Sequence, residues 1–169
     1  QVLDAITDAP AWIRNGRHDI LAMNQLARAL YSPVLEADAR RPANTTRFVY
    51  LNPEAAERFF VDYDQIARDA AAMLRLEAGR NPSDEDLIAL VGELSTRSEL
   101  FRQRWASQDV RFHRSGRKRL RHPVVGQRDL LEPHGDVEQF VVAAHPVEEF
   151  VGGLLDDRRA RVVVLVDPV

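Results

Sequence analysis

The spacing of apolar residues changes along the chain, and this change constrains the fold more than any other feature. Between Asn24 and Trp105 the apolar residues recur at steps of three and four, the period of an amphipathic helix. From Val110 onward they recur at steps of two, the period of a β-strand. The sequence therefore predicts an α+β fold in which helices cover one antiparallel sheet.

A β-hairpin is predicted to open the fold. Two short apolar runs flank Asn15 and Gly16, and both residues tolerate the positive φ that tight hairpin turns require. Asn24 then caps a helix whose apolar face continues to Tyr31 and which stops at Pro33. We expect this helix to pack on the hairpin.

Three more helical segments follow. The first spans residues 54–60, behind the Asx-Pro start signal at Asn52 and Pro53. The second has an apolar stripe formed by Ile66, Ala70, Met73, Leu74 and Glu77. The third begins at a capping box in residues 83–86 and is either one long helix or two with a kink.

Strands are predicted to return after the helices. They comprise the basic segment 111–121, then residues 123–126 and 139–144. A short helix over residues 148–157 precedes a final, fully buried strand over residues 162–166. The basic segment is either a solvated hairpin or a surface for DNA phosphates or an anionic ligand.

Length and composition limit the classes of protein to which the chain can belong. Its 169 residues fit one domain, 1–169, and the absence of Cys excludes disulfide scaffolds and cysteine-ligated metals. A net charge of -3 argues against a surface that binds nucleic acid throughout. No apolar run reaches the roughly 18 residues of a membrane span, and a signal peptide is missing, so we expect a cytoplasmic protein without a membrane partner. Because the chain starts at Gln1 without Met, we expect it to be processed or part of a longer protein.

Catalytic motifs are missing from the sequence. The five His residues lack the spacing of a helical metal site, and no nucleophile elbow, Walker A loop or dinucleotide-binding glycine motif occurs. The acidic cluster in residues 84–86 is explained by its place at a helix N-terminus. We therefore expect no enzymatic activity, no metal and no cofactor, and an enzyme ranks lowest among the alternatives.

Several spaced motifs resemble the C-terminal domain of MmyB-like transcription regulators. They are residues 10–12 (PAW), 17–24 (RHDILAMN), 44–53 (NTTRFVYLNP) and 120–126 (LRHPVVG). Further residues between positions 74 and 105 fall in the order of that family, so the resemblance covers about residues 10–145. It implies a PAS-like sheet with an apolar pocket between the sheet and the helices.

The resemblance also implies a function. Members of this family join such a sensing domain to an N-terminal helix-turn-helix of the Xre type, are common in actinomycetes, and include a case with a bound fatty acid. We therefore expect a regulatory domain that binds an apolar or fatty-acid-like small molecule. It would contact DNA only through a helix-turn-helix domain that is absent from this chain.

Six apolar residues on predicted inward faces are candidates for the ligand pocket. They are Trp12, Phe48, Met73, Phe101, Trp105 and Val125. They either line an elongated pocket, in the usual range of about 300 to 1,000 Å³, or merely fill a core. Trp105 ends a helical stripe, so we expect it deep at the helix–sheet contact, where Trp105→Ala should cost roughly 3 to 5 kcal/mol.

Four polar residues with apolar neighbours are candidates to pair with a ligand carboxylate. They are Asn24, Arg47, Arg75 and His122. Asn24 has a rival role as a helix cap, and a His before Pro123 is more often a satisfied strand residue. No one of the four stands out as the anchor.

A homodimer is expected, because a regulator that reads two operator half-sites needs two-fold symmetry. The final strand, residues 162–166, is apolar throughout, so its own sheet, a helix or a partner must cover it. The resemblance offers no precedent for this strand inside the monomer, which favours the interface. The alternative function is therefore a dimerisation module without a ligand, in which the helical stripe 87–105 and this strand contact another copy.

Overall fold

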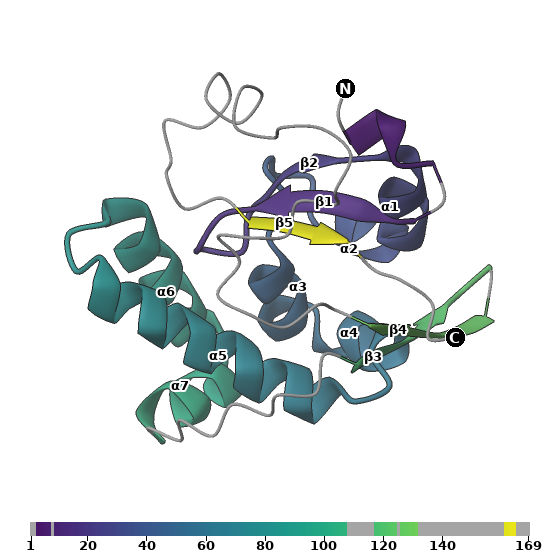
Figure 1. The fold of residues 1–169 in the computed structure, drawn as a ribbon. Coiled ribbons are helices and arrows are strands. Elements are labelled where there is room, and N and C mark those ends of the chain that lie inside the picture. Colours follow the sequence, from purple (N-terminus) through teal and green to yellow (C-terminus); the bar gives the residue numbers. More distant parts are fainter. Residues whose placement is uncertain (1–2, 8, 108–116, 125, 132–160, 165–169) are drawn as a thin grey trace.

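Figure 1 shows a computed structural model of the chain, in which residues 3–7, 9–107, 117–124, 126–131 and 161–164 are described. The strands are β1 (Ala11–Arg14), β2 (Ile20–Met23), β3 (Arg117–His122), β4 (Gly126–Leu131) and β5 (Arg161–Val164). The helices are the 3₁₀ turn η1 (Leu3–Ala5), α1 (Gln25–Leu30), α2 (Ser32–Ala37), α3 (Thr45–Leu51), α4 (Pro53–Phe59), α5 (Tyr63–Arg80), α6 (Glu85–Arg97) and α7 (Glu99–Ala106). Helices predominate and the sheets are antiparallel, so the predicted α+β class is confirmed.

The first sheet has the strand order β2-β1-β5 and joins segments from both ends of the sequence (Figure 1). In the hairpin of β1 and β2, Trp12 lies opposite Met23. On its other side β1 pairs with β5, where Ala11 lies opposite Val164. The apolar strand predicted at residues 162–166 therefore pairs, over its described part, within its own chain.

Alternate residues of β1 enter two different apolar clusters. Trp12 belongs to the main core, together with Met23 across the hairpin. Ala11 and Ile13 pack with Leu3 of η1 in a smaller cluster. Since successive side chains of a strand point to opposite faces, β1 is buried on both faces of the sheet.

The second sheet is the hairpin of β3 and β4, so the prediction of a single sheet is wrong. An isolated bridge joins Phe60 to Leu120, and the Val61 N–H donates to the Arg119 carbonyl at 2.9 Å. The Leu120 side chain is fully buried. These contacts attach β3 to the end of α4 instead of to the strands of the first sheet.

The predicted C-terminal pattern is described only in part. β3 begins in the predicted basic segment 111–121 and ends one residue beyond it, at His122. Pro123 and Val124 form a turn where a strand was predicted, and Gly126 has a φ of 74°, a conformation that favours glycine. The strand predicted over residues 139–144 and the helix over 148–157 lie outside the described residues.

The first hairpin does not have the predicted two-residue turn. Its loop is residues 15–19, and the positive φ of 67° belongs to His18 rather than to Asn15 or Gly16. The Asn15 side chain organises the loop, because its Oδ1 accepts the Asp19 N–H at 2.9 Å. The loop is therefore held by a hydrogen bond to the Asn15 side chain and not by the positive φ angles that the Asn-Gly pair predicted.

Four short helices connect the hairpin to the long helices. Asn24 caps α1, as predicted, and accepts the Ala27 N–H at 2.8 Å. Pro33 lies in the first turn of α2, where a missing N–H costs little, so a second helix begins where the first was expected to stop. The apolar stretch 48–51 is the second half of α3, which Asn44 caps.

The buried face of α5 is offset from the predicted stripe. Its buried residues are Ala67, Ala71, Ala72, Leu74 and Glu77. The stripe was right for Leu74 and Glu77, whereas Ile66, Ala70 and Met73 are only half-buried. Small alanines let α5 approach α3 and α7 closely, and a search for large apolar residues overlooks them.

Two helices follow the capping box, as the kinked alternative predicted. Asp84 caps α6 and accepts the Leu87 N–H at 3.0 Å. Ser98 is extended, with φ -130° and ψ 112°, and its Oγ accepts the Phe101 N–H at 3.2 Å. Ser98 therefore ends α6 and starts α7.

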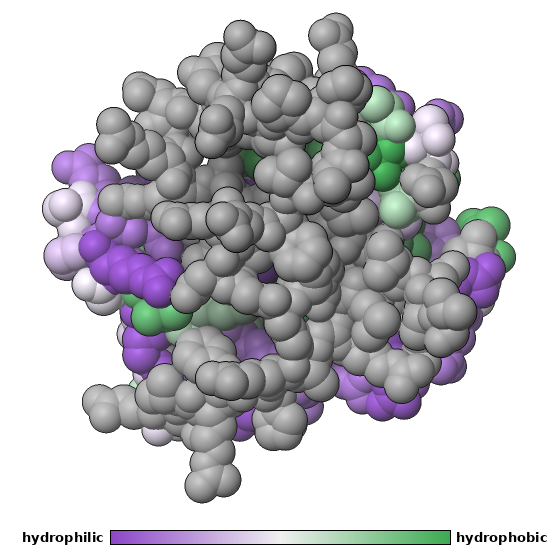
Figure 2. All heavy atoms as spheres, viewed as in Figure 1, coloured by the Kyte–Doolittle hydropathy of each residue, from purple (hydrophilic) through white to green (hydrophobic). Residues whose placement is uncertain are grey.

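The long helices are amphipathic. Figure 2 shows a mainly hydrophilic surface where α5 and α6 are described, at the left of the view. Their inward residues Leu74, Leu90 and Leu94 are buried. Within the described parts of the chain, no helix has the length and hydropathy that a membrane span requires. Each long helix thus contributes one buried face to the core.

Trp105 does not lie at a helix–sheet contact, so that prediction is wrong. Its half-buried ring stacks on Phe101 with centroids 5.4 Å apart, and α7 packs against α5 and α6. The deep position belongs to Phe101, which has an exposed fraction of 0% and meets Tyr50 at 4.9 Å. The break at Ser98 redirects the helix and so changes what its last residues contact.

We expect Phe101→Ala to reduce the free energy of unfolding by about 3 to 5 kcal/mol, because it leaves a cavity in a closed core. Trp105→Ala should cost clearly less, since its ring is only half-buried. Urea denaturation of both variants measures the difference. A larger loss for Trp105→Ala would contradict this packing.

Candidate functional site

Most of the apolar residues predicted to line a ligand pocket belong to one core. Trp12, Phe48 and Phe101 are buried in the main core, and the half-buried Trp105 packs against it beside α5. Met73 borders the loop of the first hairpin, and Val125 lies outside the described residues. The structure therefore gathers four of the six candidates in the core, where their side chains are packed against other apolar groups.

A chain of aromatic contacts connects β1 to the short helices. Trp12 and Tyr31 have ring centroids 4.7 Å apart, and Tyr31 meets Phe59 at 5.7 Å. Phe59 in turn meets Phe48 at 6.0 Å and Phe60 at 4.9 Å. Tilted and edge-on rings at these distances attract one another. This set of five rings is called the aromatic cluster below.

Asn24 has no capacity left for a ligand. Its Oδ1 accepts the N–H groups of Ala11 at 3.1 Å and Ala27 at 2.8 Å. Its Nδ2 donates to the carbonyls of Ile6 and Ala9, both at 2.8 Å. An amide has two donors and one acceptor oxygen, and all are used here. Asn24 is a helix cap that also holds the N-terminal segment against β1.

Arg47 and Arg75 are both engaged with the protein. The Arg47 Nε donates to Glu93 at 2.8 Å. The Arg75 guanidinium lies 5.2 Å from the centre of the Trp105 ring, and its Nη2 donates to the carbonyls of Arg104, at 2.9 Å, and Trp105. Arg75 thus satisfies the last carbonyls of α7, and the cation–π contact explains why Trp105 is covered.

His122 joins β3 to the junction between α1 and α2. Its Nδ1 accepts the Val124 N–H at 3.2 Å, and its Nε2 lies 3.0 Å from the Ala29 carbonyl. These partners require a hydrogen on Nε2 and none on Nδ1, which is a neutral tautomer. The Ser32 hydroxyl lies a further 3.4 Å from Nε2. His122 is therefore a satisfied strand residue, the second of the two roles considered for it.

Two hollows among the described residues differ in size and lining. The smaller, about 20 Å³, lies between the hairpin loop and α5 and is lined in part by Gly16, His18, Met73 and Glu77. The larger, about 320 Å³, opens to solvent and is lined by Tyr50, Leu51, Pro53, Tyr63, Arg97, Ser98, Glu99 and Leu100. The first has room for one water, and the second reaches the lower end of small-molecule sites, about 300 to 1,000 Å³. Neither is bounded by Trp12 or Phe48.

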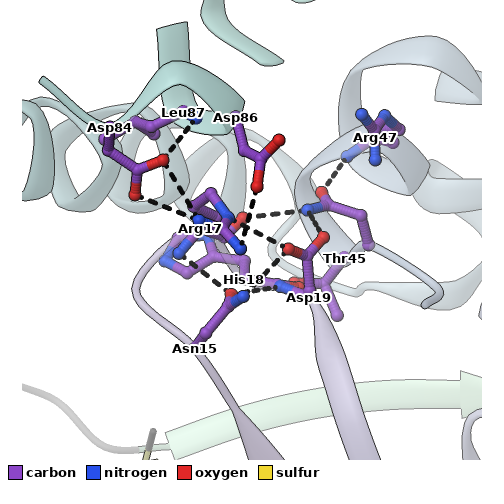
Figure 3. A network of polar contacts seen from close by, with 10 residues as sticks. Asn15, Arg17, His18, Asp19, Thr45, Arg47, Asp84, Asp86 and Leu87 are labelled. Atoms are coloured by element: carbon purple, nitrogen blue, oxygen red, sulfur yellow. Dashed lines mark hydrogen bonds and ion pairs between the residues drawn. The ribbon is translucent and has the colours of Figure 1, made fainter. Parts of the chain in front are cut away.

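A network of polar side chains ties the hairpin loop to α3 (Figure 3). Asp19 lies at its centre. Its Oδ2 accepts from Asn15 Nδ2 at 2.9 Å, and its Oδ1 accepts from Asn44 Nδ2 at 2.7 Å. Asn44 Nδ2 also donates to the Arg17 carbonyl at 2.8 Å, while Asn44 Oδ1 caps α3. One buried carboxylate thus holds both the loop and the start of a helix.

Arg17 extends this network to α6. Its Nη1 lies 3.1 Å from both carboxylate oxygens of Asp84, the cap of α6, and its Nε lies 3.4 Å from Asp19 (Figure 3). Burial opposes the charge of Arg17, but Asp84 and Asp19 outweigh it and raise the pKa of the guanidinium. Within the described ranges, no group of three His, Asp or Glu side chains could hold a metal ion. The network is therefore a structural junction.

His18 and Glu77 complete the contacts of the loop. His18 is 3% exposed, and its Nδ1 lies 2.7 Å from Thr46 Oγ1 on α3. The buried Glu77 carboxylate accepts from Asn81 and lies against Gly16, where a Cβ would be 2.4 Å from Glu77 Cδ. Gly16 is needed for this close approach, not for a positive φ.

Sequence reasoning did not identify these network residues as a set. The segments 17–24 and 44–53 stood out only through the family resemblance. Arg17 is separated from Asn44 by 27 positions and from Asp84 by 67, so their contacts have no local pattern. Asp84 was expected only as part of a helix start.

Glu93 on α6 is shared by Arg40, Arg47 and Arg97, each at 2.8 Å. Burial by itself would raise the pKa of Glu93, but hydrogen bonds from Arg40 and Arg47 outweigh it and lower the pKa to about 2. Arg40 also pairs with Asp38 at 2.7 Å. This junction links α3 to α6 and carries more positive than negative charge.

The comparison with known families gives one match. The family described as the MmyB-like transcription regulator ligand binding domain matches residues 1–151. No curated protein matches the chain. The matched range includes the aromatic cluster, the polar network and both hollows, and it ends before β5.

We expect Gly16→Ala to destabilise the protein and Gly92→Ala to stabilise it. A Cβ at Gly16 would collide with Glu77, whereas a Cβ at Gly92 in α6 meets nothing within 4 Å. Replacing glycine inside a helix should add about 0.5 to 1 kcal/mol to the free energy of unfolding. Urea denaturation measures both effects. If the collision is the cause, Glu77→Ala should recover part of the loss in the Gly16→Ala background, and an unchanged loss would argue against it.

Stability should depend on pH through Glu93. Its pKa is lowered from 4.5 to about 2 in the fold, so its contribution is complete above the unfolded pKa and is lost as pH falls toward 2. Glu93→Gln should therefore destabilise the protein strongly at pH 7 and less at pH 3.5. Glu57→Gln, at an exposed position of α4, is the control. A destabilisation by Glu93→Gln that is equal at both pH values would contradict the ion-pair origin.

Proposed function

The chain belongs to the family of MmyB-like transcription regulator ligand binding domains, and from this membership we propose that it senses a small molecule for a bacterial DNA-binding regulator. The family is one of regulatory domains and not of enzymes. The match over residues 1–151 is the observation that carries the proposal. Contact with DNA, in the cytoplasm, would be made by a helix-turn-helix domain of the same regulator.

The proposed ligand is an apolar, fatty-acid-like molecule that binds between the first sheet and the short helices. The aromatic cluster supports this choice, because Trp12, Tyr31 and Phe48 provide an apolar wall directly under β1. A polar ligand would lose its hydrogen bonds with water there. The polar candidates Asn24 and His122 are satisfied by backbone groups, which also favours a ligand held mainly by apolar contacts.

Ligand binding at this place requires a change in packing. Trp12, Tyr31 and Phe48 are each 2% exposed and fill the space between β1 and the helices. An apolar chain would have to displace at least one of these rings. A ligand that binds the displaced arrangement better shifts the protein toward it, which is what a sensor must do.

Displacement of the Tyr31 ring would affect parts of the structure beyond the aromatic cluster. It lies at the junction of α1 and α2, between Ala29 and Ser32, the two residues that His122 of β3 contacts. A shift of Tyr31 would therefore move the point at which the second sheet is attached. This offers a route from the proposed pocket to the β3–β4 hairpin.

A dimerisation module without a ligand is the alternative function. This alternative was based on the apolar strand at residues 162–166. The described part of that strand pairs with β1 of its own chain. This intramolecular pairing favours the sensing function over dimerisation through that edge of β5. We retain a homodimer as part of the proposal, on the ground that operator half-sites call for two-fold symmetry.

Native mass spectrometry of the purified chain tests the function. If the domain senses a lipid, the spectrum should contain a lipid-sized mass that disappears after delipidation and returns when dodecanoate is added. Decanol, which has the apolar chain without the carboxylate, tests how much the head group matters. A chain that neither retains nor takes up any of these compounds would contradict the proposal.

The two Trp residues can locate the ligand. Trp105→Phe leaves only Trp12, in the aromatic cluster, and Trp12→Phe leaves only Trp105, beside α5. We expect dodecanoate to shift the emission of Trp12 and to leave that of Trp105 unchanged. Fluorescence titration of both variants makes the measurement. A response of Trp105 alone would place the ligand away from the sheet.

A further inference from the structure

The larger hollow lies apart from the aromatic cluster and combines an apolar lining with unused donors. We propose that it is a second binding site, specific for a small aromatic carboxylate whose ring lies against Tyr63 and whose carboxylate is bound by Arg97 and Ser98. This site is independent of the sensing function proposed above. It would give the domain a second chemical input.

One side of this hollow is formed by apolar and aromatic residues and the other by Arg97, Ser98 and Glu99. The Tyr63 hydroxyl donates to the Val49 carbonyl at 3.1 Å, and the Tyr50 hydroxyl donates to the Ala67 carbonyl. Both hydroxyls are thus used by the backbone. Tyr50 is buried and its ring packs edge-on against Phe101, so the half-buried Tyr63 offers the accessible aromatic surface. The aliphatic residues of the lining are Leu51, Pro53 and Leu100. A volume of about 320 Å³ suits one or two fused rings better than a long chain.

Arg97 supplies the positive charge. Its Nη1 binds Glu93 at 2.8 Å, but the same carboxylate also serves Arg40 and Arg47. No described residue accepts from the Nε or Nη2 of Arg97, whose side chain is 55% exposed. Glu99 also lines the hollow, and its charge is met by hydrogen bonds from Arg102 and Gln103. The arginines around Glu93 therefore leave an excess of positive charge beside the hollow.

Ser98 supplies a neutral donor next to this charge. The residue is 7% exposed, and its Oγ accepts the Phe101 N–H. Among the described residues nothing accepts the hydrogen of its hydroxyl, so this donor is available to a group in the hollow. A ligand carboxylate in the hollow would accept from Ser98 and from the guanidinium of Arg97 together. Charge-assisted hydrogen bonds of this kind are among the strong ones.

The experiment uses 2-naphthoate as the probe and naphthalene-2-carboxamide as its neutral counterpart. Isothermal titration calorimetry of the intact chain measures affinity, and amide chemical shifts locate the probe. Arg97→Gln removes the charge at an exposed position. Ser98→Asp keeps a good helix cap but places a negative charge at the site. Arg28→Gln, on the exposed face of α1, is the matched control.

We expect saturable binding of 2-naphthoate, with shifts at Tyr50, Leu51 and Leu100, and binding of the carboxamide that is weaker by about tenfold or more. Arg97→Gln and Ser98→Asp should each weaken the binding of 2-naphthoate by a similar factor, whereas Arg28→Gln should leave the affinity unchanged. Three results would overturn the site: no saturable binding, equal affinity for the carboxamide, or shifts confined to the surroundings of Trp12. The outcome leaves the sensing proposal untouched, since dodecanoate is tested separately at the aromatic cluster.

Discussion

The buried carboxylate of Asp19 is the interaction on which most of the structure depends. Its oxygens accept hydrogen bonds from Asn15 in the hairpin loop and Asn44 at the start of α3. Arg17 beside it connects the same loop to the cap of α6. Without this acceptor, buried amide donors would be left unsatisfied, at a cost comparable to a large fraction of a domain's stability. Asp19 therefore connects the hairpin to α3 directly, and Arg17 extends the connection to Asp84 on α6.

The position of α3 in turn decides the character of two separate regions. Phe48 points into the aromatic cluster under β1, while Arg47, the preceding residue, pairs with Glu93 on α6. The first region is apolar, and occupying it requires its rings to move. The second is charged, open to solvent and close to the larger hollow. A sensing domain with these two environments is suited to ligands of different chemistry.

Local signals predicted much of the fold correctly. Asn24 caps α1, Asp84 lies at the start of α6, and two helices follow, as the kinked alternative predicted without placing the break at Ser98. The predictions of a deep Trp105 at a helix–sheet contact and of a single sheet were wrong for a different reason. Each depended on which element the residue would contact, and neither periodicity nor propensity contains that information. The ligand site stays a prediction, and the structure adds that its four polar candidates are engaged with groups of the protein itself, which no local pattern indicates.

The sequence by itself determined the α+β class, the helix starts at Asn24 and Asp84, and the family to which the chain belongs. These features depend on residues close together in the chain, such as a cap and the N–H group three positions later. Only the tertiary structure decided that the first and last described strands share a sheet, and that Asp19, Asn44 and Asp84 meet around one loop. It also decided which arginines keep unused donors. Contacts between distant segments depend on how whole elements pack, and packing is a property of the assembled core and not of any local pattern.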